Sequence, residues 1–345
     1  MATKSVSELR KDLVSGDWIV IATGRAKRPE QFLQQKKKVI AAPKSKCAFE
    51  NPQAAGNADP LLVYGKGTVR HPTKKNDWFL QVIPNKYPAF SQTGSKCPPP
   101  QRSQGPYKWM EGIGSHEVLI TRDHVRHMGK MTAQEVFMVV HAYYERYMIL
   151  KNDACSKYIS IFHNHGKSAG ASIAHPHSQI VAIPVVPPDV GNSLRGSKEY
   201  FHNNGKCVHC LMIEHEQKQK IRVVYENKKF VVFCPYVSRT AFEMRIFPKH
   251  HQAYFEEISQ EGIELLADAL RNALAKTTVG LGDPDYNFFL HTAPIEDGHF
   301  DHYHWHFEVL PKTVTWAGFE LGTGIEISSI TPEVAAKFLR KIKVK

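Results

Sequence analysis

The chain has 345 residues, of which 42% are hydrophobic and 23% charged, and this composition excludes a disordered or fibrous protein. No apolar run approaches the ~20 residues needed to span a bilayer, and the N-terminus lacks the apolar segment of a secretory signal, so we expect a cytoplasmic protein without membrane contact. The formal net charge of +12 attracts phosphorylated partners, but the basic residues are dispersed rather than interleaved with aromatic ones, which argues against nucleic acid.

The first half of the chain is typical of strands and one helix separated by polar loops. A basic turn with Arg25 and Arg28 follows a strand predicted over residues 17–22; it suits an anion contact, and a solvated loop fits equally well. Thr132 and Glu135 have the spacing of a capping box and predict a helix that continues to about residue 150. Further strands are predicted from residue 78, over residues 117–121 and over residues 158–162.

A run of small residues, 166–172, then leads into an alternating segment with His175, His177 and Gln179. Small residues let the backbone approach a ligand closely and direct N–H groups at it, which suits a phosphate. Residues two apart on a strand share a face, so the two imidazoles and the carboxamide should point the same way. We interpret this segment as a phosphate site; the alternative is a polar strand edge that is rich in histidine.

The second half repeats this order. His251 follows His124, and His302 follows His175, at the same interval of 127 residues (251 − 124 and 302 − 175). Both intervals contain a helix and a strand in the same order, which favours an internal repeat of two β–β–α–β–β halves. The second half is predicted to hold strands over residues 230–235, 242–247 and 286–290, a helix over residues 259–275, and a second alternating histidine strand over residues 302–310.

Cysteines and histidines recur at matching places in both halves. In the second half Cys207 and Cys210 form a C-x-x-C pair that, with His251 and His302, makes a Cys2His2 set for structural zinc. His250 is the rival of His251, and unmetallated thiols are the alternative. The other thiols lack partner spacing and are expected to be ordinary: Cys97, Cys155 and Cys234.

The first half has a less complete set of metal ligands. Cys47, His124 and His175 occupy the corresponding places, but Glu50 stands where a second cysteine would be. A carboxylate can ligate zinc, so a site made of these four residues is possible. Loss of the metal from this half is the alternative.

With these residues in place, the chain resembles the galactose-1-phosphate uridylyltransferase family, a branch of the histidine-triad superfamily. The resemblance covers nearly all of both halves, and its most specific piece is His175-Pro-His-Ser-Gln179, preceded by Asn164-His-Gly166 and Gly170-Ala-Ser172. Further similar segments lie at residues 25–29, 84–88 and 317–324. The resemblance implies an α+β fold of two fused histidine-triad-like halves, residues 1–190 and 191–345, each an antiparallel sheet with a packed helix. It also implies a homodimer.

The resemblance further implies nucleotidyl transfer in two displacements. His177 would attack the α-phosphorus of a nucleotide sugar and carry the nucleotidyl group to a second sugar 1-phosphate. Gln179 and Ser172 would donate hydrogen bonds to phosphoryl oxygens, while a metal on His175 would fix the strand. The substrate contacts would come from Arg25, Arg28, Asn85, Asn164, Gly170, Ala171, Phe319 and Glu320. We therefore expect a hexose-1-phosphate uridylyltransferase with zinc.

Two departures from the better-known uridylyltransferases keep alternatives open. Glu50 replaces the second cysteine of the first metal set, and the tail from Gly318 to Gly324 lacks their glutamine-bearing ending. That tail and the segment from Gly170 to His175 are similar to ADP-glucose phosphorylases, in which the same histidine carries AMP and inorganic phosphate accepts it. A nucleotide hydrolase and a non-catalytic nucleotide- or RNA-binding protein are the remaining alternatives.

Overall fold

The computed structural model of the protein describes residues 7–25, 32, 43–72, 77–90, 97–295 and 298–344, with the side chain of Arg25 left out. Ten antiparallel strands form one sheet in the order β10-β11-β12-β14-β13-β8-β9-β7-β4-β3. The first half supplies β3 (Leu62–Gly65), β4 (Trp78–Pro84), β7 (Ser115–Thr121), β8 (Tyr158–His165) and β9 (His177–Ile183). The second half supplies β10 (Val223–Glu226), β11 (Phe230–Phe233), β12 (Met244–Pro248), β13 (Tyr286–His291) and β14 (His306–Pro311).

The two halves meet at the centre of this sheet. There β8 pairs with β13 in antiparallel register, with Asn164 opposite Asn287 and His163 opposite Phe288. The predicted α+β fold, with an antiparallel sheet and a packed helix in each half, is confirmed. The structure adds that the two sheets are continuous, so residues on β13 lie directly beside the predicted site on β8 and β9.

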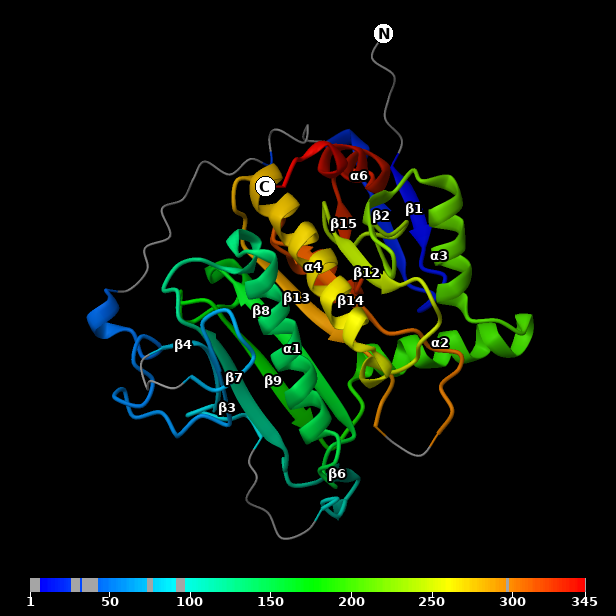
Figure 1. Cartoon of the computed structure of the whole chain (residues 1–345). Coiled ribbons are helices and arrows are strands. Elements are labelled where there is room, and N and C mark those ends of the chain that lie inside the picture. The colour runs from blue at the N-terminus through cyan, green and yellow to red at the C-terminus, as the bar shows by residue number, and fades with distance from the viewer. Residues whose placement is uncertain are drawn as a thin grey trace.

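Two long helices, α1 (Ala133–Leu150) and α4 (Gln260–Leu281), lie side by side across one face of the sheet (Figure 1). The predicted capping box starts α1: the Glu135 N–H donates to Thr132 Oγ1, and the Glu135 carboxylate accepts the Thr132 N–H at 2.8 Å. Ser259 caps α4, which ends at Gly282 in the left-handed conformation. The main hydrophobic core fills the space between the sheet and these helices. The alternating polar side chains of the histidine strands point to the opposite face of the sheet.

Smaller elements surround the sheet. A second sheet joins β1 (Glu8–Lys11) and β2 (Trp18–Ile21) to β15 (Ile327–Ser328), and β5 (Arg102–Gln104) pairs with β6 (Tyr107–Trp109). The remaining helices are α2 (Pro188–Asn204), α3 (Val208–Gln219), α5 (Gly318–Thr323) and α6 (Pro332–Lys341), with short 3-10 turns η1 (Thr23–Arg25), η3 (Lys44–Lys46), η4 (Met128–Lys130), η5 (Lys167–Ala169) and η6 (Phe255–Glu257). No helix among the described residues is long and apolar enough to cross a membrane. The domain boundary at residue 190 stays a prediction.

Cys97 and Cys155 form a disulfide whose Cα atoms lie 5.0 Å apart. It joins the segment before β5 to the connection between α1 and β8. The expectation that both residues are ordinary thiols is wrong. The two positions are 58 residues apart, and only folding brings them together.

Candidate active site and metal centres

His177 opens β9 and is buried. Its Nδ1 lies 2.9 Å from the backbone oxygen of His175. A carbonyl oxygen only accepts hydrogen bonds, so Nδ1 carries the proton and Nε2 presents its lone pair. Burial lowers the pKa of His177, which keeps the ring neutral near pH 7. An imidazole in this state can act as a nucleophile through Nε2.

A chain of hydrogen bonds orients Gln179, which lies two residues further along β9. The Ala89 N–H donates to Nδ1 of His116 at 3.1 Å, which leaves the proton of this imidazole on Nε2. That Nε2 lies 2.7 Å from Oε1 of Gln179 and 3.0 Å from Nδ2 of Asn85. Because Oε1 of Gln179 is occupied, its amide N–H groups are left to face a ligand.

The small-residue turn before β9 uses several of its own N–H groups. The N–H groups of Ala169, Gly170 and Ala171 donate to carbonyl oxygens of residues 166 and 167 at 3.0–3.2 Å. The expectation that these groups point at a phosphate is therefore corrected for these three residues, because they close the turn instead. Ser172 is exposed, and neither its N–H nor its hydroxyl bonds to another residue that the structure describes, so it retains free donors.

The second half supports this turn from β13 and the residues before it. The Ser168 N–H donates to the Asp285 carboxylate at 2.7 Å, and a Cβ added to Gly166, whose φ is +83°, would lie 2.0 Å from that carboxylate. Nδ2 of Asn287 donates to Oδ1 of Asn164 and to the backbone oxygen of residue 169, at 2.8 Å in both cases. The amide nitrogen of Asn164 is thereby left to face the site.

Four predicted substrate contacts are not tested by the residues that the structure describes around this site. Arg28 lies outside the described residues, and Arg25 ends η1 with a side chain that is likewise not described. Phe319 and Glu320 lie on α5, where Phe319 is 50% exposed and the Glu320 carboxylate accepts the backbone N–H of residue 317. The roles of all four in substrate binding stay predictions.

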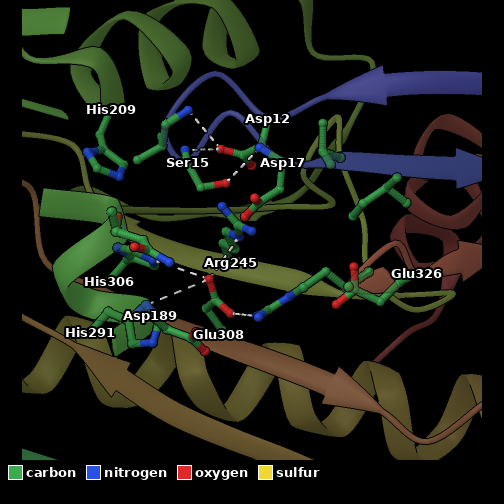
Figure 2. Close-up of a pocket in the computed structure, with 17 residues that line it drawn as sticks. Asp12, Ser15, Asp17, Asp189, His209, Arg245, His291, His306, Glu308 and Glu326 are labelled. Carbon is green, nitrogen blue, oxygen red and sulfur yellow. Dashed lines mark hydrogen bonds and ion pairs between the residues drawn. The ribbon is translucent and has the colours of Figure 1, made fainter. Parts of the chain in front are cut away.

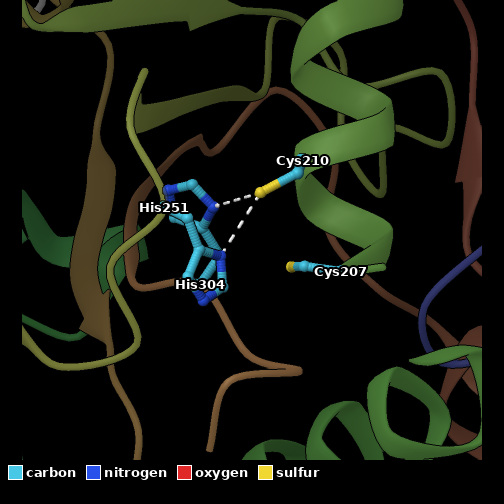
Figure 3. Close-up of side chains that lie close together, drawn as sticks. All are labelled: Cys207, Cys210, His251 and His304. Carbon is cyan, nitrogen blue, oxygen red and sulfur yellow. Dashed lines mark hydrogen bonds between the residues drawn. The ribbon is translucent and has the colours of Figure 1, made fainter. Parts of the chain in front are cut away.

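Cys207, Cys210, His251 and His304 converge in the second half (Figure 3). The structure thus brings His304, and not the predicted His302, to the cysteines. His302 lies in the turn before β14, and the repeat interval lengthens there: His304 follows His175 by 129 residues (304 − 175). An analysis that assumes one constant interval of 127 residues cannot detect this insertion of two residues.

Three of these ligand atoms are spaced like ligands of one tetrahedral metal ion. Sγ of Cys210 lies 3.3 Å from Nδ1 of His251 and 3.6 Å from Nδ1 of His304, close to the separation of about 3.5 Å that zinc bond lengths require. Nε2 of His304 lies 3.0 Å from the Pro248 carbonyl oxygen and must donate to it, which turns the Nδ1 lone pair toward the thiols. Hydrogen bonding from Cys210 lowers the pKa of the Cys207 thiol, which favours the thiolate that ligates metal.

The first half repeats this arrangement with one fewer thiol. Cys47, His124 and His175 come together, with Nδ1 of His175 lying 3.5 Å from Sγ of Cys47 and 3.3 Å from Nδ1 of His124. Nε2 of His175 donates to the Thr121 carbonyl at 2.7 Å, as His304 does to Pro248. Glu50 contacts His124 at 3.1 Å but lies outside the convergent group, so its role as a ligand stays a prediction.

A cavity of about 340 Å³ occupies the place in the second half that corresponds to the His177 site (Figure 2). His306 lies there with its Nδ1 donating to the His304 carbonyl at 3.1 Å, as His177 does to His175. Its Nε2 faces Glu308 at 3.4 Å, and Glu308 also pairs with Arg239 and Arg245. A constant interval of 127 residues would make His304 the counterpart of His177. The structure corrects this, because the residue with the equivalent contact is His306.

Comparisons with known proteins agree with this architecture. Residues 1–187 match the family described as "Galactose-1-phosphate uridyl transferase, N-terminal domain", and residues 103–344 match a domain of unknown function (DUF4921). The ADP-glucose phosphorylase of Arabidopsis thaliana is 33% identical over 98% of this chain and 93% of that protein. The galactose-1-phosphate uridylyltransferase of Thermotoga maritima is 29% identical over 98% of this chain and 99% of that protein.

The chain belongs to the galactose-1-phosphate uridylyltransferase family. Among solved structures, that of an A. thaliana ADP-glucose phosphorylase with bound ADP-glucose has a TM-score of 0.80 and 30% identity, and it covers 99% of this chain and 100% of that one. A uridylyltransferase structure has a TM-score of 0.72 and 27% identity over 97% of each chain. The predicted family resemblance is confirmed, and the chain is an enzyme of a nucleotidyltransferase family.

Sequence reasoning missed several residues of this site. His116 and Asn287 contact predicted site residues, Asp285 accepts the Ser168 N–H in the small-residue turn, and the Phe49 ring lies 5.1 Å from the His177 ring. His116 precedes a predicted strand without any motif around it. Asp285 and Asn287 belong to the other half of the repeat, so only the register between β8 and β13 reveals them.

Proposed function

We propose that this protein transfers a nucleotidyl group from a nucleotide sugar to a phosphorylated acceptor through His177. The supporting observation is the hydrogen bond from Nδ1 to the His175 carbonyl, because it leaves Nε2 unprotonated and directed out of the strand. Nε2 attacks the α-phosphorus, the N–P bond forms, and the bond from phosphorus to the bridging oxygen breaks. The sugar 1-phosphate leaves with that oxygen.

The surrounding residues stabilise the charges of this step. The imidazole gains positive charge as the N–P bond forms, and the His175 carbonyl accepts its remaining N–H. Gln179 and Ser172 retain donors for the phosphoryl oxygens. In the second displacement a phosphate oxygen of the acceptor attacks the same phosphorus and releases the imidazole.

We propose ADP-glucose as the donor and inorganic phosphate as the acceptor. The identity with ADP-glucose phosphorylase is 33%, against 29% with the T. maritima uridylyltransferase, and residues 170–175 and 318–324 are similar to the phosphorylases. Hexose-1-phosphate uridylyltransfer, which the sequence favoured, is the second candidate, because both relatives align along nearly the whole chain. The homodimer and the cytoplasmic location stay predictions.

We also propose that zinc binds Cys207, Cys210, His251 and His304, and that the first-half group of Cys47, His124 and His175 is a second candidate site. Bound zinc would tie α3 to the segments after β12 and before β14, and its role would be structural. His175 would fix the start of β9 two residues before His177.

The test is the intact mass of the protein after separate incubation with ADP-glucose and UDP-glucose, quenched under mildly basic conditions. A gain of one AMP that is absent from His177→Asn supports the proposed donor. A gain of one UMP would instead support hexose-1-phosphate uridylyltransfer, the second candidate function. No adduct from either donor, with folded protein, contradicts the covalent mechanism.

A further inference from the structure

His127, His165 and Asp283 form a cluster that the site around His177 does not use. They come from three places in the sequence: His127 precedes η4, His165 ends β8, and Asp283 follows α4. His165 and Asn164 are neighbours on a strand, so their side chains point to opposite faces of the sheet. The cluster therefore lies on the helix-covered face, behind the candidate active site.

The three side chains are spaced like ligands of one ion. Nε2 of His127 lies 2.9 Å from Oδ1 of Asp283, and Nε2 of His165 lies 3.4 Å from the same oxygen. Ligands at the bond lengths of tetrahedral zinc lie about 3.3 Å from each other. The two rings are close as well, with centroids 4.2 Å apart. These distances leave one shared point at which all three could meet a metal.

The contact between His127 and Asp283 is a close ion pair that lacks the geometry of a well-formed hydrogen bond. Nε2 of His127 and Oδ1 of Asp283 are both buried, and neither has a partner in hydrogen-bond geometry among the residues that the structure describes. Their short separation therefore lacks the alignment of an N–H with its acceptor. Two lone pairs directed at one bound ion would produce this arrangement. A buried polar atom without a partner is rare, and a bound ion is one of its explanations.

Two further atoms of the cluster, Nδ1 of His127 and Oδ2 of Asp283, already have partners. Nδ1 of His127 lies 3.3 Å from the Tyr286 hydroxyl, an outer contact of the kind that orients a metal-bound imidazole. Oδ2 of Asp283 pairs with Lys130, which leaves Oδ1 for the histidines. Asp283 itself has a φ of +65°, a strained value for a residue other than glycine that is frequent at ligand sites.

We propose that His127, His165 and Asp283 bind a divalent transition metal, with zinc the best match to two imidazoles and one carboxylate. The ligand atoms are Nε2 of both histidines and Oδ1 of the aspartate. Three protein ligands leave one position for water. This site has no thiolate, which distinguishes it from the two cysteine-containing groups.

The position of this site gives it a structural consequence. His165 directly precedes Gly166, and Asp283 stands two residues before Asp285, whose carboxylate accepts the Ser168 N–H. A metal would therefore connect the segment between α4 and β13 to the small-residue turn of the other half. It would stabilise the turn from the helix-covered face of the sheet, whereas the substrate would bind on the opposite face.

The test is the zinc content per chain of protein purified from zinc-supplemented medium, measured by elemental analysis. His165→Gln and Asp283→Asn should each contain one zinc fewer than the wild type. Cys210→Ser is the matched control and should lose a zinc from a different site, so its combination with His165→Gln should lose two. Unchanged zinc content in folded His165→Gln and Asp283→Asn would overturn the proposal.

A second measurement needs no variant. Crystals of the wild-type protein grown with zinc should show an anomalous scattering peak between His127, His165 and Asp283. Absence of that peak while the Cys207 group shows one would also overturn the proposal. In cobalt-substituted protein, the difference spectrum between the wild type and His165→Gln should lack the thiolate charge-transfer band, because this site has no sulfur ligand.

Discussion

His177 and His306 hold equivalent positions in the two halves, and they differ in what faces their outer nitrogen. Each donates from Nδ1 to the carbonyl two residues earlier, at 2.9 and 3.1 Å. Two residues beyond the histidine, the first half has the carboxamide Gln179 and the second half the carboxylate Glu308. One half therefore presents hydrogen-bond donors, and the other presents a negative charge.

The charge in the second half is balanced internally. Burial disfavours the Glu308 carboxylate, but Arg239 and Arg245 outweigh this effect and hold its pKa well below the usual range. Burial also lowers the pKa of His306 to about 4, so its imidazole is neutral near pH 7, as that of His177 is. Under the proposed mechanism, an equivalent histidine with the same tautomer is not sufficient for phosphoryl chemistry. Its neighbours decide whether a diphosphate can approach.

The most direct test of this difference between the two halves is to replace each histidine in turn. We expect His177→Asn to lower nucleotidyl transfer by at least about 10⁴-fold, because no nucleophile remains. His306→Asn is the matched control and should keep turnover. Steady-state kinetics with ADP-glucose and phosphate measures both. Comparable losses in the two variants would mean that the halves share the chemistry.

Glu308→Gln tests the balance of charge in the second half. The change leaves the buried guanidinium of Arg245 and the partly buried one of Arg239 without this carboxylate, and we expect the free energy of unfolding to fall by about 3–5 kcal/mol. Urea denaturation monitored by circular dichroism measures it. Gln179→Met in the first half, at a side chain with no charge, should change stability much less. Equal effects of the two changes would contradict a stabilising charge network around Glu308.

Gln179→Glu makes the first half resemble the second. A carboxylate beside His177 should repel the diphosphate and remove a donor, and we expect kcat to fall by about 10²–10³-fold. Gln260→Glu, at the start of α4, adds the same charge on the helix-covered face and should leave kcat unchanged. A Gln179→Glu variant with normal turnover would show that this carboxamide does not contact the reacting phosphate.

The smallest expected effect concerns the contribution of the second half to the first. Asn287→Leu removes the donor to Asn164 and to residue 169, and the loss of about 1.4 kcal/mol should lower kcat/KM about tenfold. Ser160→Ala, at the corresponding position of β8, is the matched control and should not change kcat/KM. If Asn287→Leu lowered only thermal stability and left the kinetics intact, its role would be confined to packing.

The sequence by itself determined the features that depend on local spacing. The capping box of α1, the alternation of His175, His177 and Gln179, and the C-x-x-C pair all follow from periods and intervals that the chain carries locally. The repeat was visible for the same reason, and it predicted two antiparallel halves. Each of these inferences needs only residues that are close together in sequence or related by one constant interval.

Tertiary structure decided everything that depends on an insertion or on pairing between distant strands. A two-residue lengthening between β13 and β14 exchanges His302 for His304 and gives Glu308, not His306, the position in the repeat that corresponds to Gln179. The β8–β13 register brings Asn287 to Asn164, and folding brings Cys97 to Cys155 and His127 to Asp283. Such contacts are set by the packing of the whole sheet and its helices, which no local period encodes.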